Sequence, residues 1–398
     1  MSDNLPFEIQ LEIMKKLPVK SLIQFRSVSK TWKYTIDSTH FISTYSSQAP
    51  HLLVSHEHDS IYISIADDHN FPQHQLSLTT PQLIHHCDTI DSSHGLLCLY
   101  IDYLSFHPTH FKMNMVVLWN VSIRKLVGVV VPNVGNGMFK TEVGFGVCRE
   151  TVDPKIVKIT YIDNEKDVET VTSIPWQVEV FSLSDGVWRL PYNNLPRKSI
   201  RLTHVQVALD GFIYWLAENR IRMDNENKTC SLIVSFDMTS EEFREVRLPD
   251  CLAQTARCNL YMSKLRESLV VVEQSVEANN LDFVVWIMED GVSKSFTKLF
   301  GGNVYTPEYA WVLGFRNNGE VIIEIIDDGA GKLVVYEPSS EHINDLGIIN
   351  MKWSLSVCSY KETLLLLDHP YLTVYNGNNT LKFEDDLSHE QIKSLLKM

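Results

Sequence analysis

The side chains best suited to chemistry are histidines, and most of them gather in one stretch. Eleven of the fifteen histidines lie between residues 40 and 110. A metal site needs several such ligands converging at fixed spacing on a rigid element. His56-Glu57-His58 offers a single pair, and the adjacent His85 and His86 would point to opposite faces of a strand. The histidines therefore indicate polar loops, and we expect no metal site.

The seven cysteines show no pairing pattern. They are odd in number and scattered, and no CxxC motif occurs, so neither a zinc ribbon nor a redox motif is predicted. Cys98 lies in the apolar run GLLCLY, where a thiol behaves as a small buried hydrophobe. We expect buried, reduced thiols at Cys87, Cys98, Cys148, Cys230, Cys251, Cys258 and Cys358.

Motifs for catalysis or cofactor binding are incomplete. Gly144-Phe145-Gly146 lacks the third glycine and the following helix of a dinucleotide loop, and neither a GxSxG elbow nor a P-loop occurs. The acid pairs lie in predicted turns, where carboxylates are ordinarily solvated; they are Asp67-Asp68, Asp327-Asp328 and Asp385-Asp386. The sequence therefore predicts no catalytic residue and no cofactor.

Composition and charge describe a globular chain with two unlike parts. With 398 residues and 44% hydrophobic content, the chain exceeds one ordinary core, so two domains or a repeat architecture are expected. No apolar run approaches the ~18 residues of a membrane span, and the acidic start MSDNLPFEIQ is unlike a secretory signal. We expect a soluble protein of the cytoplasm, the nucleus or both. Residues 1–45 hold six bases and four acids, whereas the remainder holds 29 bases and 45 acids, which argues against nucleic acid as the main ligand.

The first 45 residues predict a small helical head. Ile9, Ile13 and Leu17 recur at i, i+4 and i+8, with Asn4 as a candidate cap and Pro6 in the first turn. Pro18 ends this helix and opens a second, which carries Leu22, Phe25 and Val28, and Ser29 caps a third with Trp32 and Ile36. Three such helices cannot bury every apolar face among themselves. We expect Leu17, Val19 and Leu22 to stay uncovered for another polypeptide; the alternative is packing on the chain's own strands.

After residue 50 the pattern predicts repeated β-hairpins. Glycine turns precede apolar runs in SHGLLCLY (93–100), LDGFIYWLA (209–217) and NNGEVIIEII (317–326). A second kind of strand begins near residues 116, 178, 233, 283, 333 and 372. Several strands per unit of about 40–50 residues are typical of a β-propeller, with a sandwich as the rival fold. Residues 51–66 can supply a further unit, and Trp119, Trp188, Trp215, Trp286 and Trp311 lie within or at the ends of these strands. DLSHEQIKSLLKM predicts a C-terminal helix with a capping box of Ser388 and Gln391.

The head resembles an F-box across about forty residues. The stretch LPFEIQLEIMKKLPVKSLIQFRSVSKTW carries the opening Leu-Pro, the second Leu-Pro-Val-Lys-Ser-Leu, the Phe-Arg pair, and a tryptophan followed by Phe41. Ser29 stands where plant F-boxes often have cysteine. The resemblance implies docking onto a Skp-type adaptor and, through it, a cullin–RING ligase. Trp32 is expected to stabilise the head itself. The motif positions associated with the adaptor interface are Leu5, Pro6, Ile9, Leu17, Pro18, Val19, Leu22 and Phe25.

The remainder resembles the F-box-associated domain of plant F-box proteins, a family that includes the S-locus F-box and F-box–kelch-like proteins. The correspondence runs from SSHGLLCLY through VVLWNVSIRKL, VEVFSLSDGVWR and LDGFIYWLA to YKETLLLLD, about residues 90–370. Two positions depart from the family pattern: the turn in VGFGVCRETVDPKIVKI, and Asn120-Val121-Ser122 in place of Asn-Pro-Ser.

The resemblance gives a fold and a function to test. We expect an α+β chain with a three-helix F-box at residues 1–45, a propeller-like β body at 46–386 and a terminal helix at 387–398. Its function would be that of a non-catalytic substrate receptor of an SCF-type ubiquitin ligase, with no nucleic acid or membrane partner. The target is unknown, and its contacts are expected in loops such as 102–114, 163–176, 192–204 and 218–229. A non-degradative scaffold and a ligand-binding or enzymatic propeller remain alternatives.

Overall fold

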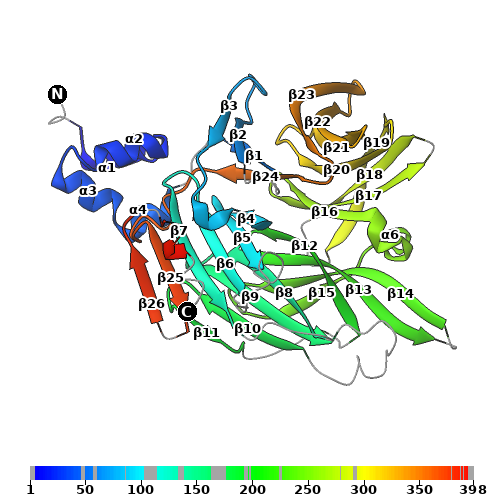
Figure 1. Cartoon of the computed structure of the whole chain (residues 1–398), viewed down its shortest axis with the longest axis horizontal. Helices are drawn as coiled ribbons and strands as arrows, with labels where there is room; N and C mark the ends of the chain where they lie inside the picture. The colour runs from blue at the N-terminus through cyan, green and yellow to red at the C-terminus, as the bar shows by residue number, and fades with distance from the viewer. Residues whose placement is uncertain are drawn as a thin grey trace. The chain divides into compact units, whose positions relative to one another are not determined.

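In the computed structural model the chain begins with short helices and continues almost entirely as strands (Figure 1). The residues described are 5–45, 50–56, 61–85, 87–102, 114–132, 139–162, 176–191, 196, 199–223, 226–277, 279–289, 294–377, 379–385, 387–388 and 390–392. Over these ranges no helix has the length and apolar character needed to cross a membrane.

Four helices form the head. They are α1 (Phe7–Met14), α2 (Val19–Phe25), α3 (Lys30–Ile36) and α4 (Thr39–Thr44). The sequence predicted the first three of these helices but not α4. Proline occupies the N-cap of α1 and of α2, where its fixed φ suits the entry into a helix. Pro6 therefore precedes α1, whereas the sequence placed it in the first turn; Asn4 lies outside the described residues. Ser29 caps α3 as predicted, because its Oγ accepts the N–H of Trp32 at 3.1 Å.

The chain divides into two compact units. The first comprises Met1–Val54, Asp59–Val130 and Cys358–Met398, and the second comprises Ser55–His58 and Val131–Val357. The head thus belongs to the same unit as the beginning and the end of the strand-built body.

The strands that lie wholly or mainly in the first unit belong to two sheets. One has the order β24-β1-β2-β3, with β24 (Leu355–Lys361), β1 (Pro50–His56), β2 (Ile61–Ala66) and β3 (Gln75–Leu78). The other has the order β26-β25-β7-β6-β5-β4. Its strands are β4 (Asp88–Ser93), β5 (Leu96–Asp102), β6 (Asn114–Asn120), β7 (Lys125–Val131), β25 (Leu372–Asn376) and β26 (Asn379–Phe383). The 3-10 helix η1 (Gln82–Ile84) lies between β3 and β4.

The second unit holds four antiparallel sheets of four strands. The first two are β11-β10-β9-β8 and β12-β13-β14-β15. Their bounds are β8 (Phe139–Val147), β9 (Pro154–Ile162), β10 (Gln177–Ser182), β11 (Val187–Arg189), β12 (Ile200–Leu209), β13 (Phe212–Met223), β14 (Glu226–Asp237) and β15 (Phe243–Val246). The strands of each sheet follow one another along the chain, as expected for blades joined by hairpins.

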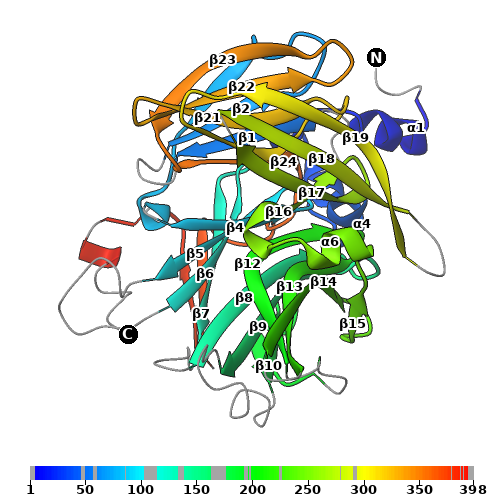
Figure 2. The same ribbon diagram turned by 90° about the vertical axis from the view of Figure 1, so that its right-hand side faces the viewer.

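The other two sheets of the second unit are β16-β17-β18-β19 and β20-β21-β22-β23 (Figure 2). Helix α6 (Asp250–Gln254) and the 3-10 helix η2 (Arg257–Asn259) precede them. The strands are β16 (Leu260–Leu265), β17 (Ser268–Glu277), β18 (Asn280–Glu289), β19 (Ser295–Tyr305), β20 (Tyr309–Phe315), β21 (Val321–Asp327), β22 (Ala330–Glu337) and β23 (His342–Met351).

The predicted repeat is confirmed for five of its six units. The strands expected near residues 116, 178, 233, 283 and 333 are members of five different sheets. The strand near 372 is β25, which pairs in parallel with β7 and so extends the sheet of β6. Residues 51–66 supply β1 and β2 of a separate sheet, as the sequence suggested. Six sheets result in the described part of the chain, and the five tryptophans named above all lie in strands.

Large side chains fill the cores of the sheets. Trp119 is 1% exposed within the core of the first unit, which also includes Leu387 and Ile392 near the C-terminus. In the second unit Trp215 is equally buried among strands β9 to β15. At the C-terminus the N–H of Ser388 donates to Gln391 Oε1, and the N–H of Gln391 donates to Ser388 Oγ. The predicted capping box is thereby confirmed, although most of the predicted helix lies outside the described residues.

Candidate functional site

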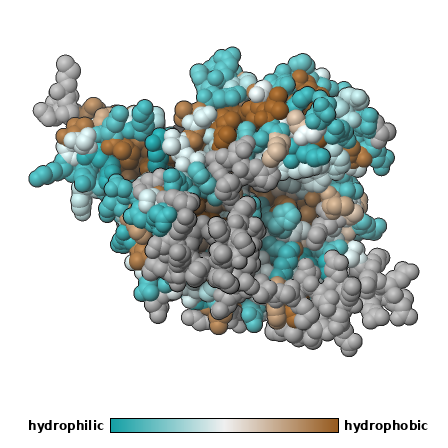
Figure 3. Space-filling model, in the orientation of Figure 1, coloured by the Kyte–Doolittle hydropathy of each residue, from teal (hydrophilic) through white to brown (hydrophobic). Residues whose placement is uncertain are grey.

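Exposed apolar side chains gather at helix α1 and at Leu5, which precedes it. Leu5, Phe7, Ile9 and Ile13 are each 44–49% exposed, and Met14 is the buried residue of this helix. A helix with apolar side chains beyond one face needs a second partner to cover them. In Figure 3 apolar surface is visible on this head, interspersed with polar atoms.

The predicted adaptor-binding residues fall into three groups by exposure. Leu5, Pro6, Ile9 and Pro18 are exposed, and Leu17 and Phe25 are partly buried. Val19 and Leu22 are 0% exposed. The expectation that Leu17, Val19 and Leu22 stay uncovered is therefore wrong for the latter two, because the chain itself covers them. Phe7 and Ile13 also lie on the exposed surface. The signal that could have found them is that the apolar residues of α1 fall on more than one face of the helix.

The buried start of α2 is tied to the strand-built part of the same unit. The N–H of Val19 donates to Glu362 Oε2 at 3.0 Å, across 343 residues of sequence. Pro18 at the N-cap offers no side-chain acceptor, so the Glu362 carboxylate satisfies a donor that would otherwise lack an intrahelical partner. Negative charge is also favourable at a helix N-terminus. The start of α2 thus contacts the strand-built part of its own unit through this hydrogen bond.

A second contact close to the start of α2 involves a buried tyrosine. Tyr45 follows α4 and is 4% exposed, and its hydroxyl donates to the carbonyl oxygen of Leu17 at 2.7 Å. Burial, with a smaller contribution from the charge of Glu362, raises the pKa of Tyr45 above its usual range. The hydroxyl therefore remains protonated and can donate at any ordinary pH.

The remaining head contacts hold the helices to one another. The ring of Trp32 lies 5.0 Å from that of Phe25, at an interplanar angle of 78°, an edge-to-face pair. Arg26 forms a two-bonded ion pair with Asp37, at 2.5 and 3.0 Å. These contacts support the expected structural role of Trp32. They also leave α1 as the part of the head with the most exposed apolar side chains.

The histidine-rich stretch gathers no metal ligands where it is described. No group of three or more His, Cys, Asp or Glu side chains converges anywhere in the described ranges. His58 and His86 lie outside them. All seven cysteines are free, but only Cys87, Cys98 and Cys148 are buried; Cys230, Cys251 and Cys258 are exposed, contrary to the expectation of buried thiols.

The proposed target-binding loops are only partly described. Residues 103–113, 163–175 and most of 192–198 lie outside the described residues. The fourth segment, 218–229, is mainly strand, because β13 and β14 pair from Phe212↔Asp237 to Met223↔Glu226. The described residues of this segment therefore form the paired strands of a long hairpin, and the prediction of a loop is wrong for residues 218–223 and 226–229.

Family models match both parts of the chain. The F-box domain model matches residues 2–44, and the model of the F-box associated beta propeller domain matches residues 29–365. The second match covers well over half of the chain. It agrees with the short helices followed by six sheets.

Relatives in Arabidopsis thaliana give the same result. The putative F-box protein At3g16210 is 28% identical over 63% of this chain and 62% of its own length. The F-box protein At1g52495 is 25% identical over 80% and 74%, and the F-box protein At3g07870 is 23% identical over 86% and 87%. The chain thus spans less than two thirds of the first of these relatives.

Solved structures resemble the chain only distantly. AztD from Citrobacter koseri has a TM-score of 0.36 at 9% identity, covering 79% of this chain and 99% of its own. A polysaccharide lyase of family PL25 has a TM-score of 0.38 at 11% identity, covering 77% and 73%. Similarity at this level carries no argument about function. The matches of the family models, in contrast, cover both the helical head and the sheets, and the chain belongs to the plant F-box proteins that carry an F-box-associated β-propeller domain.

Proposed function

We propose that this protein is the substrate-recognition subunit of an SCF-type ubiquitin ligase, whose head binds a Skp-type adaptor and whose β body binds a target protein. The observation that carries the proposal is the exposed apolar surface of α1 within an F-box: Leu5, Phe7, Ile9 and Ile13 are each nearly half exposed. Interfaces draw most of their energy from a few apolar anchors that become buried on binding.

The role requires no chemistry from the chain itself. A receptor that holds its target beside the transfer machinery raises the target's effective concentration there, and the ligase supplies the reaction. The hydrogen bond from the N–H of Val19 to Glu362 supports this role. A head that is held to the strand-built part of its own unit restricts where a bound target can lie.

Co-purification tests the adaptor half of the proposal. The full-length chain and a Skp-type adaptor, expressed together, are expected to elute as one complex. A variant with Ile9 and Ile13 both replaced by aspartate should leave the complex while keeping its circular dichroism spectrum. An adaptor that fails to bind the folded wild-type chain would refute the proposal.

The half-life of captured partners tests the target half. Proteins that co-purify with the chain should persist longer in cells when the variant with aspartate at both Ile9 and Ile13 replaces the wild type. Unchanged half-lives would favour a non-degradative scaffold that uses the same head.

A further inference from the structure

One short segment of the first unit contacts both the head and the strands. Residues 359–369 contain the end of β24 and the beginning of the connection to β25. The four leucines near their centre, Leu364 to Leu367, are at most 8% exposed. The same segment carries Glu362, which accepts the N–H of Val19 at the start of α2. Any residue that holds this segment in place therefore also holds the contact with the head.

Asn120, the last residue of β6, binds the backbone of this segment and is 0% exposed. Its Nδ2 donates to the carbonyl oxygen of Thr363 at 3.1 Å and to that of Leu365 at 2.7 Å. Its Oδ1 accepts the N–H of Ser122 at 2.9 Å and that of Ile123 at 3.3 Å. An asparagine amide offers two N–H donors and one acceptor oxygen, so both ends of this side chain are paired. Loss of the amide would take these donors from the carbonyl groups of two buried residues, and buried polar groups without partners are costly.

A lysine at the other end of the β6–β7 turn holds the far part of the segment. Lys125 Nζ donates to the carbonyl oxygen of Leu367 at 2.5 Å and also to that of His369. Between these bonds and those of Asn120, Leu366 has a φ of 69°, in the left-handed region that a leucine rarely adopts. Such a conformation persists only where the surrounding structure holds it. The β6–β7 turn therefore fixes the path of the segment after Glu362.

The backbone on both sides of Glu362 is closely held. Thr363, whose carbonyl oxygen accepts from Asn120, directly follows it. Lys361 directly precedes it, and a Cβ added to Gly95 in the β4–β5 turn would lie 2.2 Å from the Lys361 carbonyl oxygen. Gly95 has a φ of 75°, which a glycine adopts without strain. The position of the Glu362 carboxylate is thus set by two turns of the same sheet.

We propose that Asn120 is a positioning residue, which fixes the orientation of the F-box head relative to the strands of the first unit. It acts through Glu362, because its hydrogen bonds hold the segment whose carboxylate caps α2. The consequence for ubiquitin transfer, a fixed direction in which the adaptor is held, rests on the proposed function. The positioning of the head does not.

A distance measurement on the full-length chain tests this role. Spin labels are placed at Tyr34, which is 81% exposed on α3, and at the exposed Thr380 on β26. Noncanonical amino acids carry the labels, because three native cysteines are exposed. The wild type should give one narrow distance distribution by double electron–electron resonance. Asn120→Asp keeps an acceptor for the turn but sets a carboxylate against two carbonyl oxygens, so the distribution should broaden.

Hydrogen exchange measures the same effect at the helix. Amides that begin α2 should exchange about 5-fold faster in Asn120→Asp, as expected when one N-terminal cap is lost. Glu362→Ala should give a similar increase. The double variant should exchange no faster than Glu362→Ala alone, because both substitutions act on the same contact.

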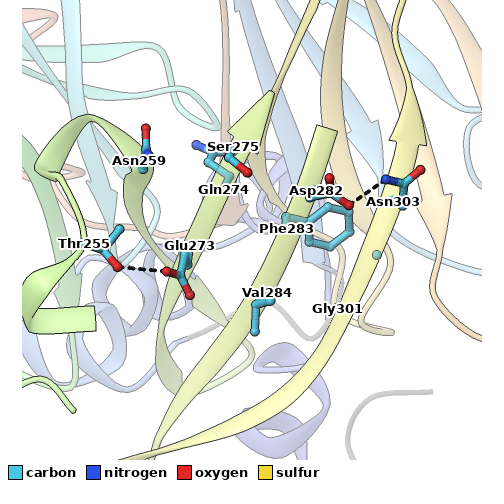
Figure 4. A pocket seen from close by; sticks show the side chains of 11 residues that line it. Thr255, Asn259, Glu273, Gln274, Ser275, Asp282, Phe283, Val284, Gly301 and Asn303 are labelled. Carbon is cyan, nitrogen blue, oxygen red and sulfur yellow. Dashed lines mark hydrogen bonds between the residues drawn. The ribbon is translucent and has the colours of Figure 1, made fainter. Parts of the chain in front are cut away.

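Two controls separate positioning from loss of stability. Val117→Ala truncates a residue that is 0% exposed in the same strand as Asn120, so it should lower stability without broadening the distance distribution. Asn303→Asp changes an exposed asparagine of the second unit, which donates to Asp282 Oδ1 at 2.6 Å (Figure 4). It should leave the distance distribution and the exchange of α2 unchanged. Asn120→Ala, which adds no buried charge, replaces Asn120→Asp in every measurement where the latter does not fold.

Three results would overturn the proposal: an unchanged distance distribution in the folded Asn120 variant, equal broadening by Val117→Ala, or multiplied exchange rates in the double variant. Adaptor capture with the same proteins separates this role from the proposed function. The Asn120 variant should still capture the adaptor, because the exposed surface of α1 is unchanged. A broadened distribution without adaptor capture by the wild type would refute only the proposed function. Adaptor capture with an unchanged distribution would refute only the role of Asn120.

Discussion

The backbone N–H of Val19 and the carboxylate of Glu362 join the first turn of an F-box helix to the strand-built part of the same chain at 3.0 Å. Val19 is the first residue of α2, and Pro18 before it carries no side-chain acceptor. The carboxylate of Glu362 therefore acts as an N-cap of α2, although Glu362 lies far from α2 in the sequence.

Removal of this cap should loosen the head. Glu362→Ala is expected to lower the free energy of unfolding by about 1 kcal/mol, the usual cost of losing an N-terminal cap, and to speed hydrogen exchange at the amides that begin α2. Glu362→Gln retains an acceptor oxygen and should recover most of the loss. Denaturant titration and hydrogen exchange measure both effects. With the exposed Glu277→Ala as control, equal stability of the Glu362→Ala variant would show that the contact contributes nothing.

A buried ion triad in the second unit should make stability depend on pH. Glu241 accepts from Lys155 Nζ at 2.8 Å and from Arg189 Nη1 at 2.5 Å, and the Lys155 and Glu241 side chains are about nine-tenths buried. Burial raises the pKa of Glu241, but the hydrogen bonds from Arg189 and Lys155 outweigh it and hold this pKa below its ordinary value. A lowered folded-state pKa stabilises the protein above the unfolded-state pKa, near 4.3, and this contribution is lost as the pH falls through the folded-state value.

Glu241→Gln should therefore cost about 3 kcal/mol at pH 7, because Lys155 and Arg189 lose their counter-charge. The difference from the wild type should shrink as the pH falls below the unfolded-state pKa and through the lowered folded-state pKa of Glu241, because the wild-type carboxylate then becomes protonated as well. Denaturant titrations across this range measure it. The control is Asp210→Asn in the exposed Arg149–Asp210 pair, which should cost at most about 1 kcal/mol. A difference that is constant with pH would contradict the role assigned to Glu241.

Much of this architecture follows from local patterns in the sequence. The cap at Ser29 and the capping box of Ser388 with Gln391 involve residues three apart, so their hydrogen bonds were predictable from residue types alone. The strands near residues 178, 233, 283 and 333 were found because period-2 alternation and turn residues act within one hairpin. Where a structural outcome depends on near neighbours, the sequence predicts it well.

Contacts between distant residues were the ones that the sequence did not reveal. The backbone N–H of Val19 donates to a carboxylate 343 positions away, and the parallel pairing of β25 with β7 joins residues about 250 positions apart. An F-box motif shows which positions are apolar. It does not show whether the side chains at these positions are covered by the chain itself or by a partner. Glu273 and Asp282 likewise become diagonal neighbours only through the pairing of β17 with β18.

Gly144 illustrates a residue whose role became clear only in the structure. The sequence left Gly144-Phe145-Gly146 as an incomplete nucleotide-binding motif, whereas a Cβ at Gly144 would lie 2.1 Å from Cζ2 of the buried Trp215. Gly144→Ala should therefore lower the free energy of unfolding by about 1–3 kcal/mol through overpacking.

Gly314→Ala provides the comparison for this variant. Gly314 also lies in a strand, but the nearest atom to a Cβ added there is Ser263 Oγ at 4.0 Å. The free energy of unfolding of this variant should therefore differ from that of the wild type by less than about 1 kcal/mol. Thermal and denaturant unfolding of the pair measure the contrast. Equal stability of the two variants would show that the contact with Trp215 relaxes without cost.

The exposed surface of α1 leads to the most direct measurement, the affinity of the full-length chain for a Skp-type adaptor by calorimetry. Wild type should bind, and Ile13→Ala should weaken binding by roughly 10-fold or more, the cost of truncating one aliphatic anchor at an interface. Leu190→Ala, which truncates an even more exposed aliphatic residue in the second unit, should bind like the wild type. Absence of adaptor binding by the folded wild type, or equal weakening by both substitutions, would contradict the account.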